Sequence, residues 1–356
     1  MPFKYRADQL GSLLRPPEVL QSPDDREIVD RAVLRALERQ KQAGLKIFTD
    51  GEFHRRHFMS NFNDAVEGLD DSDLVARAWQ GGQGQATRVS GIATQKIRAV
   101  RRLCGDEVAF MKAHSPGDIK ITLPSANQFP AIAWKKAVSG HVYPTPSSFL
   151  WDVVPIIKQE IDALVAEGVK YIQIDAPRYS YFIDPKWREY LKAELGLDPD
   201  KALDEAVRAD NACIAAARGK GAVLCIHLCR GNNRSKWYAE GGYDPIAEKV
   251  FNGLDVDAFS LEYESERAGT FEPLRHVPKG KVVILGLVSS KLPQLEPADD
   301  IRRRIDEAAR RVPLDNLALS TQCGFASSME GNLLTEDEQW KKLELVVDIA
   351  KKTWRD

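Results

Sequence analysis

Two residues of the kind that bind transition metals stand close together in the stretch from Gly221 to Asn232. The stretch opens with an apolar run, Ala222–Ile226, of the length and type expected of a strand buried on both faces, and then presents His227 and Cys229. Residues two apart on an extended backbone point the same way, so an imidazole and a thiolate can reach one ion. No further ligand follows locally, which argues against a zinc finger. The alternative is a buried cysteine beside a hydrogen-bonded histidine.

The segments around this pair alternate between apolar runs typical of strands and amphipathic runs typical of helices. Glycines 44 and 168 are expected to end two of the helices, and Thr335 with Glu338 predicts a capping box for the last one. The expected helices are Asp25–Ala43, Ser147–Glu167, Asp198–Arg218, Ala298–Arg311 and Glu336–Lys351. The expected strands are Arg6–Ser12, Lys46–Asp50, Asp118–Leu123, Val169–Asp175, Ala222–His227, Ala258–Tyr263, Lys281–Leu287 and Asn316–Ser320.

Strands separated by crossover-length segments predict a parallel (β/α)8 TIM barrel that spans residues 1–356 as a single domain. A doubly wound open sheet is the alternative. One segment, residues 52–117 between the second and third strands, is too long for an ordinary crossover and includes the Gly-rich stretch Trp79–Gly84. We interpret it as an insertion over one mouth of the barrel, where it forms a lid or a contact between two copies in a homodimer. Its apolar content is too low for a core of its own.

The composition narrows the class of protein. A formal net charge of −2 over 356 residues, without a basic stripe, predicts no binding to nucleic acid. The sequence lacks a run of 18 apolar residues, which predicts no membrane span, and its N-terminus lacks the apolar core of a secretory signal. Five cysteines are too few for a disulfide framework in a chain of this length. We therefore expect a cytoplasmic protein with reduced thiols.

Function in a parallel barrel gathers at the C-terminal ends of the strands, and these ends carry polar residues in this sequence. His227, Cys229, Glu262 and Cys323 come from two strand ends and from the loops after two strands. They are acceptable zinc ligands, and closure of a barrel would bring them toward one mouth. The combination predicts a metal site, although each residue taken singly is more often a structural cap.

The series of strand ends resembles the C-terminal catalytic barrel of the cobalamin-independent methionine synthase family, most closely its short single-barrel members. The resemblance covers nearly the whole chain in the family's order. It rests on Gly11–Pro16, Asp50–Phe53, Tyr171–Pro177, His227–Asn232, Ser260–Tyr263, Gly286–Lys291 and Ser320–Phe325.

The resemblance implies a zinc-dependent methyltransferase that moves a methyl group from a methylfolate or a methylcobalamin-like donor to the thiol of homocysteine or a related small thiol. His227, Cys229, Glu262 and Cys323 would be the zinc ligands. Two thiolates and a carboxylate outweigh the charge of Zn²⁺, and such an electron-rich centre favours alkyl transfer to a bound thiolate over the making of hydroxide.

The resemblance also assigns the substrate contacts. Glu52 and Asp175 would hold the ammonium of the amino-acid substrate, and Ser12 would bind its carboxylate. The physical reading agrees, because two carboxylates that face one pocket repel each other unless a cation lies between them. The structural alternative is that Glu52 and Asp175 pair with arginines such as Arg55 and Arg178.

One departure from the family concerns the proton donor. The folate-dependent members carry a His-Ser pair after the seventh strand, whereas this sequence reads Val288-Ser289-Ser290-Lys291. Lys291 could supply the proton or a positive charge, or it could be a solvated loop lysine. Two other functions therefore stay open: a zinc-dependent transferase that opens an epoxide with coenzyme M, and a non-catalytic zinc- or thiol-binding protein that acts with a partner. Glu52 and Asp175 favour an ammonium-bearing substrate over a sulfonate.

Overall fold

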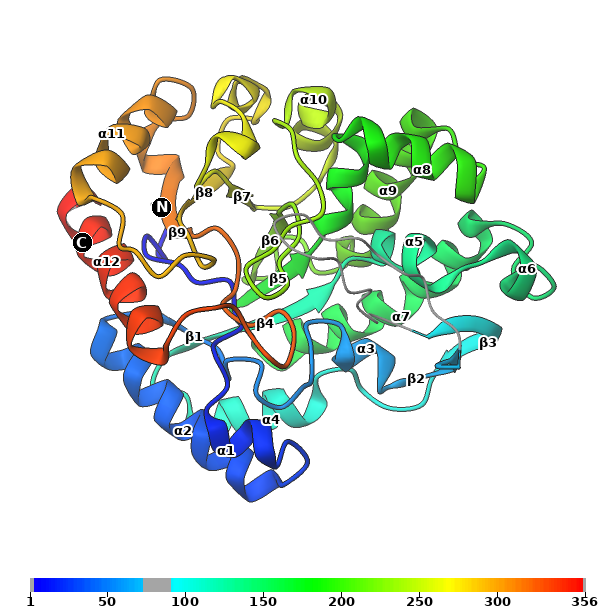
Figure 1. Cartoon of the computed structure of the whole chain (residues 1–356), viewed down its shortest axis with the longest axis horizontal. Helices are drawn as coiled ribbons and strands as arrows, with labels where there is room; N and C mark the ends of the chain where they lie inside the picture. The colour runs from blue at the N-terminus through cyan, green and yellow to red at the C-terminus, as the bar shows by residue number, and fades with distance from the viewer. Residues whose placement is uncertain (1–2, 73–90, 355–356) are drawn as a thin grey trace.

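The fold is built on a parallel sheet of seven strands at the centre of the molecule, in a computed structural model that describes residues 3–72 and 91–354. The strands follow one another in the order β1-β4-β5-β6-β7-β8-β9, and the sheet curls while the longer helices lie outside it (Figure 1). The strands are β1 Ile47–Phe48, β4 Asp118–Pro124, β5 Tyr171–Asp175, β6 Val223–Leu228, β7 Ala258–Glu262, β8 Val282–Val288 and β9 Leu317–Thr321.

These strands lie where apolar runs occur in the sequence, because both faces of the sheet are covered. Every residue of β5, β7, β8 and β9 is buried. Neighbouring strands run parallel, and their register pairs Asp175 at the end of β5 with His227 on β6, and His227 with Ser260 on β7. Their C-terminal ends therefore meet at one edge of the sheet.

The N-terminal segment lies beside β9, but it is not the regular strand Arg6–Ser12 that the sequence predicts. Only Ala7 forms a parallel bridge, with Leu319, and the flanking backbone hydrogen bonds run from Asp8 N to Leu319 O and from Leu319 N to Arg6 O, both 2.8 Å long. Polar side chains explain the shortening: the Gln9 side chain donates to Ile47 O on β1 and to Gln40, contacts that replace a backbone ladder.

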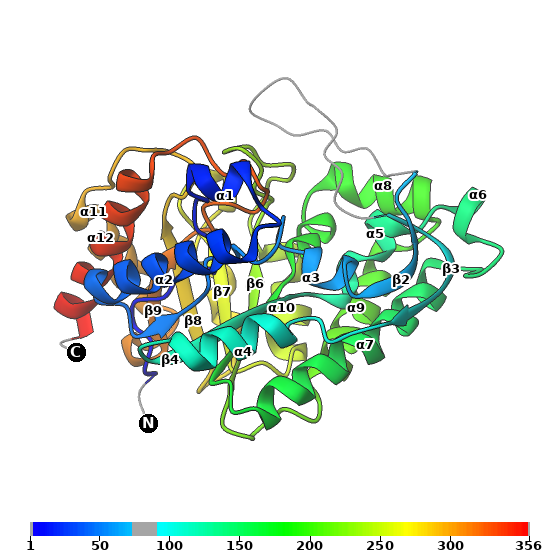
Figure 2. The ribbon, with the colours of Figure 1, turned by 90° about the horizontal axis from the view of Figure 1, so that it is seen from below.

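The helices cover the outer face of the curled sheet, as the side view shows (Figure 2). The five expected helices are present as α2 Arg26–Ala43, α7 Pro146–Ala166, α9 Pro199–Ile214, α11 Ala298–Ala309 and α12 Glu336–Trp354. Gly44 ends α2 in the left-handed conformation with φ of 88°, and the Thr335 hydroxyl accepts a hydrogen bond from Glu338 N, as their sequences predict. The sequence reading missed α4 Gly105–His114, α8 Pro185–Leu195 and α10 Asp244–Gly253, and the short helices α1 Pro17–Gln21, α3 Ser60–Asn63, α5 Pro130–Ala133 and α6 Lys136–Ser139.

The segment between β1 and β4 contains more than a crossover helix. It includes α3, the antiparallel pair β2 Val66–Asp70 and β3 Ile92–Ala99, and then α4 (Figure 1). The predicted Gly-rich stretch Trp79–Gly84 lies outside the described residues.

The interior of the curled sheet is filled by side chains from many strands. One buried cluster combines Tyr5 with residues of β1, β5, β6, β7, β8 and β9, and Cys225 belongs to it. This cysteine packs in the core as predicted, two residues before His227 on the same strand. Within residues 3–72 and 91–354, no helix has both the length and the apolar character that a bilayer crossing requires.

Candidate metal centre

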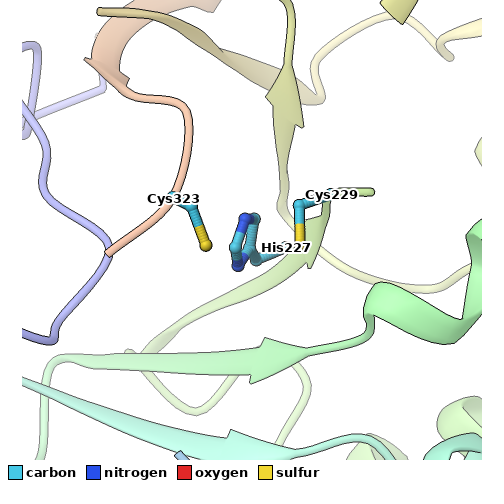
Figure 3. Close-up of side chains that lie close together, drawn as sticks. All are labelled: His227, Cys229 and Cys323. Carbon is cyan, nitrogen blue, oxygen red and sulfur yellow. The ribbon is translucent and has the colours of Figure 1, made fainter. Parts of the chain in front are cut away.

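Three metal-binding side chains meet at the C-terminal edge of the sheet. His227 comes from β6, Cys229 from the first residue after it, and Cys323 from the loop after β9. Each offers a ligand atom, and these atoms all lie within 4.8 Å of one another. In the view of Figure 3, the side chains of Cys323 and Cys229 are seen on either side of the His227 ring. All three side chains are buried, so the cluster is shielded from bulk water.

A hydrogen bond joins the side chains of Cys229 and Cys323. A hydrogen bond from the Cys229 thiol lowers the pKa of Cys323 to about 6, against the cost of burial and with help from His227 and Lys291. The same hydrogen bond to Cys323 raises the pKa of Cys229 well above its ordinary value. One sulfur is therefore already a thiolate near neutral pH, which is the form that binds a metal.

His227 is held in place by Asp175. The Nδ1 atom of His227 lies 3.0 Å from Oδ1 of Asp175, and the same carboxylate oxygen accepts a hydrogen bond of 2.8 Å from Gln173 Nε2. Burial lowers the pKa of His227, but Asp175 and Cys323 outweigh burial and raise it overall. With Nδ1 donating to the carboxylate, Nε2 would bind a metal in place of its contact of 3.4 Å with the Gln322 carbonyl oxygen. A carboxylate on the second ring nitrogen is common around ligating histidines.

Glu262, the fourth ligand implied by the resemblance, lies beside the cluster but outside the group of three. Its Oε2 accepts a hydrogen bond of 2.9 Å from the Arg230 backbone N–H, and its Oε1 lies 2.9 Å from Arg267. Burial raises the pKa of Glu262, but Lys291, Arg230 and Arg267 outweigh it and lower the pKa overall. The carboxylate is thus charged and bound to protein groups on both oxygens.

Lys291 is not a solvated loop lysine, because its side chain is buried just after β8. Its Nζ atom has no hydrogen-bond partner among the described residues. Its charge lowers the pKa of Glu262 and of Cys323. Lys291 does not line the cavity described next, so its contribution within the described structure is electrostatic.

A cavity of about 230 Å³ opens above the cluster. Among its lining residues are all three members of the cluster and the three predicted substrate contacts, Ser12, Glu52 and Asp175. The cavity therefore brings together every predicted site residue except Glu262 and Lys291.

The carboxylate of Glu52 has an oxygen available for a cation. Thr122 donates a hydrogen bond of 3.0 Å to Oε1, while the buried Oε2 has no partner among the described residues. Burial raises the pKa of Glu52 to about 7, although Arg55 opposes the rise. Arg55 Nη2 is 4.0 Å from Oε1, at the limit of an ion pair. Glu52 also has φ of 60°, a strained conformation for a residue other than glycine and one that gathers at functional sites.

Several cavity residues were not predicted as contacts. Arg178 and Tyr238 lie on one side, Asn232 hydrogen-bonds the Gly324 carbonyl at 2.7 Å, and residues 327–330 complete the wall. The signal available in the sequence was their position: they follow β5, β6 and β9, where loops gather around the strand ends. The alternative ion pair between Arg178 and Asp175 is not formed among the described residues.

Comparisons with known proteins give a consistent result. Residues 145–352 match the family model described as the catalytic domain of cobalamin-independent synthase. The chain is 37% identical to the Bacillus subtilis protein YxjH, over 99% of this chain and 95% of that one. It is 25% identical to the methionine synthase of Pyrococcus abyssi, over 90% of this chain and 81% of that one.

Solved structures agree with the sequence relatives. A putative vitamin-B12 independent methionine synthase from Listeria monocytogenes superposes with a TM-score of 0.72 at 27% identity, covering 99% of this chain and 98% of the other. A B12-independent methionine synthase from Shewanella sp. W3-18-1 shares the fold, with a TM-score of 0.77 at 20% identity over 99% of this chain and 98% of that one.

Proposed function

The chain belongs to the cobalamin-independent methionine synthase family and is a methyltransferase of that type, and on this premise we propose that it methylates the thiol of homocysteine, or of a related small thiol, at a zinc ion. The observation that carries the proposal is the placement of His227, Cys229 and Cys323 on the wall of the same cavity as Glu52 and Asp175. The donor is a methylfolate or a methylcobalamin-like molecule.

The residues fit zinc. An imidazole and two sulfurs are ligands that Zn²⁺ prefers, and His227 already has the carboxylate partner on its second nitrogen that orients a ligating histidine. When bound, the metal lowers the pKa of the incoming thiol and keeps the resulting thiolate nucleophilic. Glu262 completes the ligand set in this proposal, which requires its carboxylate to exchange one of its hydrogen bonds, to Arg230 N or to Arg267, for the metal.

The cavity residues orient the amino-acid thiol. Glu52 Oε2, which lacks a partner among the described residues, receives the substrate ammonium together with Asp175. Ser12, in the N-terminal segment, contacts the substrate carboxylate. Glu52 and Asp175 favour a thiol that carries an ammonium, which coenzyme M lacks. Lys291, as the proposed catalytic group, contributes its positive charge to the neighbouring thiolate rather than a proton to the cavity.

We extend the proposal to the architecture. The segment around Ala7 serves as the first strand of a (β/α)8 barrel that comprises residues 1–356, with β1 and β4 to β9 as the other seven. Residues 52–117 form a lid over its mouth, a reading supported by Arg56, His57 and Phe58, which belong to this segment and line the cavity.

Metal analysis tests the centre. We expect about one zinc per chain, lost in Cys229→Ala and in Cys323→Ala. Cys225→Ala is the matched control, because Cys225 is also buried and lies on β6, the strand of His227, but packs in the core. Zinc retained at full occupancy in both ligand variants would contradict the proposed centre.

Calorimetry and turnover test the reaction. The zinc-loaded protein should bind homocysteine with release of protons and bind coenzyme M more weakly. Incubation with homocysteine and either 5-methyltetrahydrofolate or methylcobalamin should then yield methionine. Binding of homocysteine without turnover on any donor would favour a non-catalytic thiol-binding role.

A further inference from the structure

Arg178 is a buried cation with no partner of opposite charge among residues 3–72 and 91–354. Its side chain belongs to the 3-10 segment Pro177–Phe182 after β5, and the residue is only 2% exposed. Nε and Nη1 are buried and donate no hydrogen bond to any described residue. The guanidinium carbon lies 4.9 Å from the ring centre of Tyr181 and 5.0 Å from that of Tyr238.

Other arginines near the site are better satisfied. Arg15 donates to the carbonyls of Glu52 and Arg55, and Arg267 pairs with Glu262. An unpaired buried donor costs roughly 1–3 kcal/mol, and more when it is charged. The rings of Tyr181 and Tyr238 attract the cation through their faces. They accept no hydrogen bond from the N–H groups that lie in the plane of the guanidinium. The rings instead hold the planar group in one orientation.

Arg178 lies in the wall of two cavities. Arg178 lines the cavity of about 230 Å³ that contains His227, Cys229 and Cys323. It also lines a smaller cavity of about 30 Å³, together with Asn127, whose Nδ2 likewise lacks a described partner. A water molecule in the smaller space could accept one of these hydrogen bonds, but it brings no charge. The positive charge still needs an anion, and only the larger cavity has room for a substrate.

We propose that Arg178 binds an oxyanion, a carboxylate above all, that one of the two substrates carries into the central cavity. The proposal rests on the proposed methyl transfer for the identity of these substrates, and it adds a recognition residue that the family resemblance does not assign. A planar guanidinium matches a carboxylate through paired N–H···O bonds. The acidic side chains Glu52 and Asp175 attract the ammonium of the acceptor, so Arg178 supplies the complementary charge in the same cavity.

The carboxylate could belong to the thiol acceptor or to the methyl donor, and binding measurements separate the two. Arg178→Met removes the charge with modest change in bulk, and Arg178→Lys keeps the charge without the fork. Arg188→Met is the matched control: Arg188 donates to the Phe182 carbonyl of the same 3-10 segment but does not line the cavity. Melting curves and zinc content verify that each variant folds, and Arg178→Lys serves if Arg178→Met does not.

Calorimetry on the zinc-loaded proteins uses homocysteine, its decarboxylated analogue 3-aminopropane-1-thiol, and 5-methyltetrahydrofolate. If the acceptor's carboxylate binds Arg178, Arg178→Met should weaken homocysteine about 10-fold or more and leave the analogue unchanged. If the donor's carboxylate binds there, 5-methyltetrahydrofolate should weaken by a similar factor while homocysteine is unaffected. Arg178→Lys should fall between the wild type and Arg178→Met in either case.

The effect of small anions on the melting temperature tests anion binding by Arg178 independently of the proposed function. Acetate and phosphate, compared with chloride at constant ionic strength, should raise the melting temperature of the wild type and of Arg188→Met more than that of Arg178→Met. If neither substrate binds the wild type, the proposed function fails, and this comparison alone decides whether Arg178 binds anions. Equal responses of Arg178→Met and Arg188→Met to both substrates and to both anions, or an equal loss for homocysteine and its analogue, would overturn the inference.

Discussion

The imidazole of His227 and the carboxylate of Asp175 are joined across two neighbouring parallel strands, Nδ1 to Oδ1, at 3.0 Å. The strand register places the two residues side by side, and Gln173, two residues earlier on β5, donates to the same oxygen at 2.8 Å. Asp175, which the sequence predicts as a contact for an ammonium, therefore fixes the ring of the candidate zinc ligand. Its second oxygen, Oδ2, accepts no hydrogen bond from a described residue and remains for a ligand.

Replacing Asp175 by Asn should weaken zinc binding. The amide of Asn is neutral, and it can present either its NH₂ group or its carbonyl oxygen to Nδ1 of His227. The tautomer with its proton on Nδ1 and Nε2 free is therefore favoured less strongly. We expect zinc affinity to fall about 10- to 100-fold, the range typical of such outer contacts. Competition with a chromophoric chelator measures the change. Asp162→Asn on α7 is the control, because Asp162 is half-buried and does not line the cavity. Equal affinities of the two variants would contradict the positioning role.

The stability of the protein should depend on pH through Glu52. Burial raises the pKa of Glu52 to about 7 in the folded state, from 4.5 for an ordinary glutamate. Between these values the folded state holds a proton that the unfolded state has released, so stability falls as pH rises from 4.5 to 7. The stabilisation is fully present below pH 4.5 and amounts to about 3 kcal/mol.

Glu52→Gln isolates this effect. The amide cannot ionise, so the free energy of unfolding of the wild type should fall relative to that of Glu52→Gln across pH 4.5 to 7, and the difference should be constant above. Contributions from other groups, such as Glu107, are largely common to both proteins. Urea unfolding at a series of pH values checks it. Parallel pH profiles for the two proteins would show that folding does not raise the pKa of Glu52.

The sequence predicts the central strands and the metal-binding cluster for the same physical reason. Runs buried on both faces must be apolar, and parallel strands bring their C-terminal ends to one edge, so His227, Cys229 and Cys323 can be placed together without knowing their contacts. The first strand is overpredicted because its side chains bind other groups, as Gln9 does with Gln40. Helix α8 had a recognisable start, since Asp184 caps it and Pro185 follows.

The contacts that complete the site depend on tertiary pairing. Glu262 is bonded to Arg267 from the loop after its own strand, and nothing in the spacing of the two residues distinguishes this pair from a metal ligand beside a solvated arginine. The sequence does not show that Arg178 lacks an ion-pair partner among the described residues, because this depends on which carboxylates lie far from it in the folded chain. Residue types and strand ends therefore predict which groups gather, while their hydrogen bonds decide which are available to a ligand.

A buried ion pair beneath the site should be costly to break. Lys120 Nζ lies 2.5 Å from Asp8 Oδ1, and it also donates to Gln9 O at 2.6 Å and to Gln173 Oε1 at 3.0 Å. Lys120→Met leaves Asp8 charged, buried and without this partner, so we expect a loss of about 3–5 kcal/mol in the free energy of unfolding.

The matched control for Lys120→Met is Lys96→Met, which breaks the exposed pair with Asp152. This change should cost less than about 1 kcal/mol. Chemical denaturation measures both variants at neutral pH. Similar losses in the two would mean that Asp8 is protonated or compensated in the folded protein.

Ser12 and Gly324 are packed so closely that a single methyl group should disturb the site. A Cβ atom on Gly324 would lie 1.9 Å from Ser12 Oγ, whereas Ser12 now accepts hydrogen bonds from Phe325 N at its carbonyl and from Ala326 N at its hydroxyl. Gly324→Ala must push the N-terminal segment away from the loop after β9, which carries Cys323. We expect a loss of about 1–3 kcal/mol in stability and weaker zinc binding.

A second substitution tests whether this clash is the cause. Ser12→Ala removes Oγ, so the double variant Ser12→Ala/Gly324→Ala should regain part of the stability and zinc affinity that Gly324→Ala loses. The other Ser12 atoms near the added methyl, Cβ at 3.1 Å and N at 3.3 Å, keep the recovery incomplete. Gly280→Ala, where no atom lies within 4 Å of the added Cβ but φ is +88°, controls for backbone strain and should leave zinc affinity unchanged. Additive losses in the double variant, measured by denaturation and chelator competition, would exclude a direct clash, because two residues in contact should show a favourable coupling when both are changed.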